Sequence, residues 1–231
     1  MDTVSAVELL DAWEAGWSRD PLRRGLALLA AARRTTPTAA AEVSVGRRDR
    51  ALFAFRAALF GTAVDAVSRC PGCDTEVEVA FDQRELLAEN EPAAGDAATV
   101  RAGGRDVPVR MPTSADLAAV LDADVPDPEE ALVRRCAPPG EPAPAAAAVA
   151  AAWTAADPLI DPCVGLACPD CGLAWEEPFD IVGYLWAELD IWGRRTLLEV
   201  HELARAYGWT EAQTLALSPW RRQCYLGLVG T

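Results

Sequence analysis

Two short cysteine motifs of the same form, Cys70-Pro71-Gly72-Cys73 and Cys168-Pro169-Asp170-Cys171, lie far apart in the chain. A short β-like run precedes each motif and an alternating run follows it, so each is expected at the tip of a hairpin. The two-residue gap lets one tight turn present two sulfurs to a metal, and Zn²⁺ takes four thiolates in a tetrahedron at about 2.3 Å. The sequence therefore predicts one structural zinc site made by Cys70, Cys73, Cys168 and Cys171.

Other interpretations of the cysteines stay open at this point. A thioredoxin-like dithiol places its CxxC motif at a helix N-terminus, whereas strand-like alternation follows both motifs here. A catalytic zinc ion would need an open coordination position, usually beside histidine or carboxylate ligands. Cys163 is either an alternative ligand or a buried thiol, and Cys136 and Cys224 occupy ordinary apolar positions.

Length and composition restrict the classes of protein further. The 231 residues are enough for one large or two small domains, and 51% of them are hydrophobic. No run has the length of a membrane span, and residues 1–4 lack signal-peptide features, so we expect a cytoplasmic protein with thiols instead of disulfides. A net charge of −14 disfavours generic nucleic-acid binding, which requires clustered positive charge.

The pattern of elements predicts an α+β protein. Its expected parts are a helical N-terminal part over 1–62, a zinc-ribbon-like centre over 63–180 and a helical C-terminal segment over 181–231. Within the centre, a mostly helical insertion at about 90–160 separates the two cysteine hairpins. The insertion includes a hairpin signal around Gly103-Gly104.

Caps and proline positions locate several helices. Asp20 before Pro21, and Ser218 before Pro219, match a cap followed by proline at the first helical position. Residues 35–46 and 137–144 are expected to be linkers. Residues 179–207 carry a broad apolar stripe at helical spacing and predict one long helix.

Aromatic and arginine side chains gather in the C-terminal third. These residues are Trp186, Trp192, Arg194, His201, Tyr207, Trp209, Trp220, Arg221 and Arg222. They fit either a small helical core or a protein-binding surface, because Trp, Tyr and Arg dominate binding hot spots. His201 is the single histidine of the chain, and without a nearby nucleophile it cannot build a catalytic triad. We therefore expect partner contacts from this region and no enzymatic activity.

The order of motifs in this region resembles that of the T4-type phage baseplate hub assembly proteins, with relatives in contractile injection systems and tailed phages. The specific part is Glu199-Val200-His201, then Leu203 to Trp209, then Leu217-Ser218 to Leu226. The resemblance is tight over about 160–228. The stretch from Met111 to Leu117 and the Leu59-Phe60-Gly61 run also look like zinc-knuckle members of the group.

The resemblance implies a non-enzymatic role, as a chaperone or minor component in assembling the hub or spike of a contractile-tail baseplate. Its expected partners are hub, spike or other tail proteins, with neither nucleic acid nor membrane, and the protein is expected in the cytoplasm or in the assembled particle. No catalytic residues carry over, since the group offers none. The alternatives are a zinc-ribbon interaction module unrelated to phage tails and a CxxC redox protein.

Overall fold

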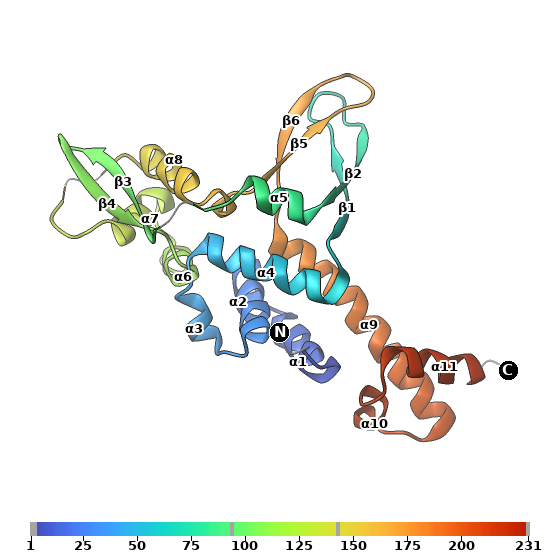
Figure 1. Cartoon of the computed structure of the whole chain (residues 1–231). Helices are drawn as coiled ribbons and strands as arrows, with labels where there is room; N and C mark the ends of the chain where they lie inside the picture. Colours follow the sequence, from blue (N-terminus) through green and yellow to red (C-terminus); the bar gives the residue numbers. More distant parts are fainter. Residues whose placement is uncertain (1–3, 93–94, 142–143, 230–231) are drawn as a thin grey trace.

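Helices dominate the described part of the chain, where three separate two-stranded antiparallel hairpins project from them (Figure 1). The computed structural model describes residues 4–92, 95–141 and 144–229. No hairpin shares a strand or an edge with another among these residues. The predicted α+β class is confirmed.

The N-terminal part contains the helices α1 (Ala6–Gly16), α2 (Pro21–Arg33), α3 (Pro37–Ala41) and α4 (Val45–Phe60). The Asp20 carboxylate accepts from the Arg23 backbone N–H and caps α2, as predicted. The expected linker at 35–46 is wrong, because Thr36 caps α3 in the same way with a proline at the first position. The chain therefore turns through a short helix where a linker was expected.

The long helix α9 (Ile181–Tyr207) confirms the prediction for this region and is the spine of the molecule. The buried side chains of its first half, Ile181, Leu185 and Leu189, lie in one core with residues of α1, α2 and α4. The predicted boundary at residue 181 therefore falls inside a core. The second half of α9 projects away and is followed by α10 (Glu211–Leu215) and α11 (Pro219–Val229) (Figure 1).

The predicted insertion has a hydrophobic core of its own. The elements are β3 (Ala97–Ala102), β4 (Arg105–Arg110), α6 (Ser114–Asp122), α7 (Pro128–Cys136) and α8 (Ala146–Ala156). Val107, Val109 and Val149 are fully buried there and Trp153 nearly so. Both glycines of the predicted Gly103-Gly104 turn have positive φ, which matches a tight hairpin turn. The expected linker at 137–144 leads into α8, and its residues 142–143 lie outside the described part.

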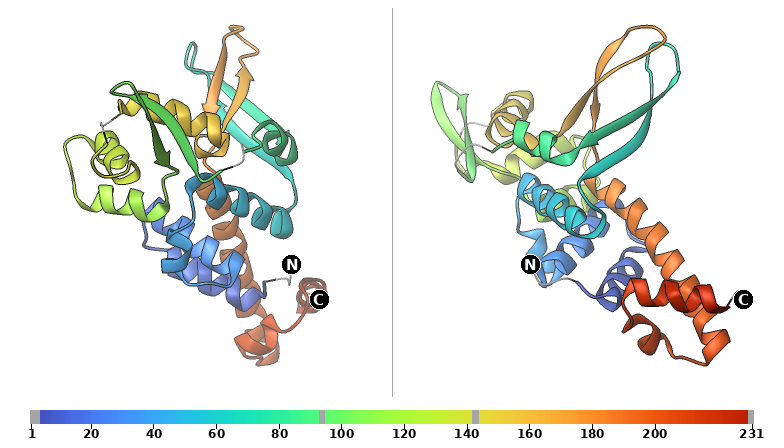
Figure 2. Two further views of the ribbon diagram at one scale, coloured as in Figure 1. Left: turned by 60° about the vertical axis from the view of Figure 1, so that its left-hand side comes forward. Right: turned by 45° about the vertical axis from the view of Figure 1, so that its right-hand side comes forward.

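The two cysteine hairpins form an arm that rises from the helical core. The first consists of β1 (Ala63–Arg69) and β2 (Glu76–Asp82), followed by α5 (Gln83–Glu89). The second follows a 3₁₀ turn at Pro158–Ile160 and consists of β5 (Cys163–Ala167) and β6 (Ala174–Pro178). The hairpins lie side by side in Figure 1 and in both views of Figure 2. We refer to them together as the hairpin arm.

Arg56 of α4 fixes the base of this arm. Its five N–H donors have five acceptors: the carbonyl oxygens of Gly61 and Ala63, the side-chain oxygen of Gln83, and both carboxylate oxygens of Glu188 on α9. One buried guanidinium thus joins α4, the start of β1, α5 and α9. This network sets the direction in which the arm leaves the core.

Candidate metal centre

Each cysteine motif folds into the same knuckle. In the first, the Cys70 N–H donates to the Thr75 carbonyl oxygen at 2.9 Å, and the Asp74 N–H donates back to the Cys70 carbonyl oxygen at 2.9 Å. Asp74 has φ 60°, a left-handed conformation that Asp tolerates better than most residues. The turn points the Cys70 and Cys73 side chains towards the second hairpin.

The second knuckle repeats these bonds. The Cys168 N–H donates to the Leu173 carbonyl oxygen at 2.8 Å, and the Gly172 N–H donates to the Cys168 carbonyl oxygen at 3.0 Å. Gly172, with φ 73°, occupies the position of Asp74. The two motifs therefore present their sulfurs in equivalent ways from opposite sides of one site.

The four sulfur atoms meet between the knuckles. All lie within 4.8 Å of one another, and two contacts join opposite motifs: Cys70 to Cys171 at 3.6 Å and Cys73 to Cys168 at 3.5 Å. Sulfurs placed 2.3 Å from a tetrahedral ion are about 3.8 Å apart, whereas a disulfide needs about 2 Å. The predicted set of four cysteines is confirmed as a cluster that fits a tetrahedral metal ion.

Burial and hydrogen bonding divide the cluster into two kinds of cysteine. The first cysteine of each motif is buried beside Val77 and the second is exposed. Hydrogen bonds with Thr75 and with the thiol of Cys168 lower the pKa of Cys73 to about 6. One of the four thiols therefore loses its proton readily. A bound divalent cation would supply the positive charge that favours deprotonation of the other three.

A polar contact beside the sulfurs also ties the knuckles together. The Thr75 hydroxyl donates to a carboxylate oxygen of Asp170 at 2.8 Å. Gly72 lies so close to the opposite knuckle that a β-carbon there would approach the Leu173 side chain at 3.0 Å. Sequence reasoning missed both features because each depends on the pairing of the knuckles.

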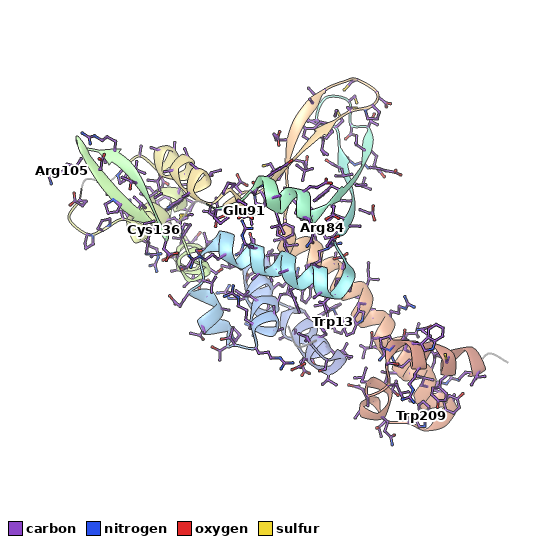
Figure 3. All side chains as sticks on the ribbon, in the orientation of Figure 1. Trp13, Arg84, Glu91, Arg105, Cys136 and Trp209 are labelled. Atoms are coloured by element: carbon purple, nitrogen blue, oxygen red, sulfur yellow. The ribbon has the colours of Figure 1, made fainter. Side chains whose placement is uncertain are left out.

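The other cysteines lie outside the cluster. Cys163 is at the base of β5, where its thiol donates to the Asp161 carbonyl oxygen at 3.7 Å, so it is not an alternative ligand in this arrangement. Cys136 is buried in the insertion core (Figure 3), and burial raises its pKa to about 11. Cys224 was expected at an apolar position and is exposed on α11.

Two of the residues expected at a partner surface are buried inside the chain, and the expectation is corrected for them. Trp186 is 9% exposed, with its ring against Gly16 of α1 and the Arg24 guanidinium over it at 4.9 Å. Arg222 is 3% exposed and forms an ion pair with Glu199 at 2.9 Å. The Trp186 side chain is part of the main core, and the Arg222 side chain holds α11 against α9.

The remaining residues of this set are accessible to different degrees. Trp192 is half-buried against the core, and Arg194 lies over the ring of Trp17 at 4.8 Å. Tyr207 and Trp209 stack at 4.8 Å between ring centroids and pack with Tyr225; Trp209 is labelled at the end of α9 in Figure 3. The exposed members of the set are Arg194, His201, Tyr207, Trp220 and Arg221.

Exposed aliphatic side chains extend this surface beyond the predicted residues. Ile191 and Leu198 lie seven positions apart on α9, and Leu228 lies near the end of α11. The helical spacing of Ile191 and Leu198 could have indicated this surface from the sequence. An apolar stripe that continues past the core-facing residues of a helix marks a second apolar face. We call α10, α11 and the second half of α9 the tail.

Neither a protein-family model, nor a curated protein, nor a solved structure matches this chain. Across residues 4–92, 95–141 and 144–229, none of the helices has the length and apolar character that a membrane span requires.

Proposed function

We propose that this chain is a non-enzymatic assembly factor in which one structural Zn²⁺ holds the hairpin arm together and the tail binds a partner. The observation that carries the proposal is the convergence of four cysteine sulfurs, from motifs far apart in sequence, within 4.8 Å. The cluster joins two hairpins that share no strand pairing. A metal ion there replaces the hydrogen bonds of a sheet as the link between them.

The donor set favours zinc with a structural role. Four thiolates in a tetrahedron are typical of structural zinc sites, and they leave no position open for water or substrate. Bound Zn²⁺ would keep all four thiols deprotonated and join the two knuckles, while Thr75 and Asp170 add a bond between them.

The assembly role rests on the resemblance to baseplate hub assembly proteins together with the exposed tail. The tail exposes Trp220 and Arg221, two residue types that dominate binding hot spots. A contractile-tail hub or spike protein is the partner that the resemblance implies. The Arg56 network at the base of the arm would then orient the metal site and the tail relative to each other.

Metal content and stability test the zinc part. We expect one Zn per chain by mass spectrometry of purified protein, and less than a tenth of that in Cys168→Ser, with a lower Tm. Cys163→Ser is the matched control, because it removes a nearby thiol that lies outside the cluster and should keep both values. A metal-free wild-type protein with a redox-active Cys70–Cys73 pair would instead support the dithiol alternative.

Co-purification with the hub and spike proteins of the same contractile system tests the assembly part. Removing the chain from residue 181 would destroy the core, so single exposed side chains should be changed instead. We expect Trp220→Ala to reduce recovery of the partner while Val67→Ala, an exposed apolar change on the arm, leaves it unchanged. Normal particle assembly in a strain that lacks this protein would contradict the assigned role.

A further inference from the structure

An apolar groove lies between α2, α6 and α7, well away from the metal site. It has a volume of about 250 Å³, and Leu121 at its mouth is 64% exposed. Its apolar lining consists of Leu22, Leu117, Val120, Leu121, Pro128 and Leu132. The groove is large enough to take one aromatic side chain.

The α6–α7 side of this groove, which we call its acidic rim, carries an excess of carboxylates: Glu129 is one of the lining residues, and Arg23, next to Leu22 on the α2 side, is paired with Asp122. Between Arg110 and Arg134 the sequence contains six carboxylates and no basic residue. Most of these carboxylates have partners within the chain, but Asp124 and Glu129 form no ion pair with any described residue. An apolar group would therefore bind in the groove more favourably if it carried a positive charge beside it.

The tail of the same protein offers an apolar side chain with a positive charge beside it. Trp220 is 77% exposed, and with Cys224 and Leu228 it forms the outward face of α11 at helical spacing. Arg221 is adjacent and exposed, and its guanidinium forms no ion pair among the residues described. Segment 181–231 contains five Arg and five Asp or Glu, so the whole net charge of −14 belongs to residues 1–180.

In Figure 1 the elements that line the groove, α2, α6 and α7, lie at the left and centre of the view, and α11 lies at the right beside the C-terminal half of α9. Because α9 is one continuous helix anchored in the core by its first half, it holds its own α11 away from its own groove. A contact between the two surfaces must therefore join different copies. Such a contact is heterologous, so it generates a ring or an open chain of molecules.

We infer that this protein self-associates head to tail, with the Trp220 side chain of one copy in the apolar groove of the next and Arg221 facing the acidic rim. The inference rests on the proposal that the tail is an interaction surface, and it names a second copy as the occupant of the groove. The metal site plays no part in it. The contact is small and strengthened by charge, so association should weaken as salt rises.

Sedimentation velocity of the full-length, metal-loaded protein over a range of concentrations tests the inference. We expect mass to rise with concentration at low salt and to fall in 0.5 M NaCl. Trp220→Ala should weaken association about tenfold or more, as for a hot-spot residue. Leu121→Arg should do the same from the other side, because it fills the groove with positive charge. Val67→Arg is the matched control at a site 59% exposed on the arm, and it should associate like the wild type.

A mixture of the two deficient variants provides the decisive measurement. Trp220→Ala keeps its groove and Leu121→Arg keeps its tail, so equal amounts should form a 1:1 dimer that cannot extend. A mixture that stays monomeric overturns the tail-to-groove contact even if each variant alone loses association. A wild-type protein that is monomeric at every concentration also overturns the inference. If that monomer still binds hub or spike proteins through Trp220, the proposed function stands without it.

Discussion

Arg56 allows the most direct test of how the fold is held together. Its side chain is 2% exposed and that of Glu188 is 24% exposed. The variant Arg56→Met keeps much of the volume but leaves three neutral acceptors without donors, at Gly61, Ala63 and Gln83. Each lost bond costs about 1 kcal/mol, and the Glu188 carboxylate loses its cation in a partly buried site. The loss should total about 4 kcal/mol, in the range measured when one partner of a buried ion pair is removed.

Urea unfolding followed by circular dichroism at fixed zinc concentration measures this loss. For a chain of this size, about 4 kcal/mol corresponds to a Tm lower by roughly 8–16 °C. Arg84→Met is the matched control: Arg84 is 74% exposed and pairs with Asp82 at the surface, so this variant should lose about 0.5 kcal/mol or less. If Arg56→Met costs no more than Arg84→Met, the base of the arm is not held by this network.

Three further outcomes follow from the fold. Burial opposes the ionisation of Asp116, but hydrogen bonds from Arg110 hold its pKa well below its usual range. This stability is present above the unfolded-state pKa of about 4 and is lost as pH falls through the lower folded-state pKa; Asp116→Asn should therefore flatten the acid limb of a stability-against-pH curve. Gly46→Ala should cost about 1–3 kcal/mol in urea unfolding, because a β-carbon there would collide with the carboxylate of Asp157, and a neutral result would mean that the contact is loose. Chelation by EDTA should lower Tm in wild-type protein by several degrees and leave a four-cysteine-to-serine variant unchanged, whereas equal shifts would place the metal elsewhere.

The cysteine site could be predicted from sequence because its information is local. Each CxxC motif specifies a knuckle by itself, and the tetrahedral requirement of a metal then brings two distant knuckles together. Helix starts are local in the same sense, as at Asp20-Pro21. The short helix α3 carries the same signal at Thr36-Pro37, which the surrounding Thr- and Ala-rich composition concealed.

The burial of Trp186 and Arg222 could not be predicted, because it depends on partners distant in sequence. The Trp186 ring is buried because Gly16 has no side chain at the point of contact. Arg222 is buried because Glu199 supplies a carboxylate 23 positions away in the chain. An aromatic or arginine cluster in sequence therefore contains both interior and surface residues, and the tertiary fold separates them.

The first half of α9 completes a core whose other walls are formed by α1, α2 and α4. Translation proceeds at about 5–20 residues per second. These early helices therefore leave the ribosome long before Ile181 does. The nascent chain therefore passes several seconds with Leu28, Leu29 and Phe53 lacking their final cover. The insertion, whose core draws only on residues 98–160, is complete before α9 is made. We expect it to fold first, so that a chain arrested before residue 181 would present an unsealed apolar surface to chaperones.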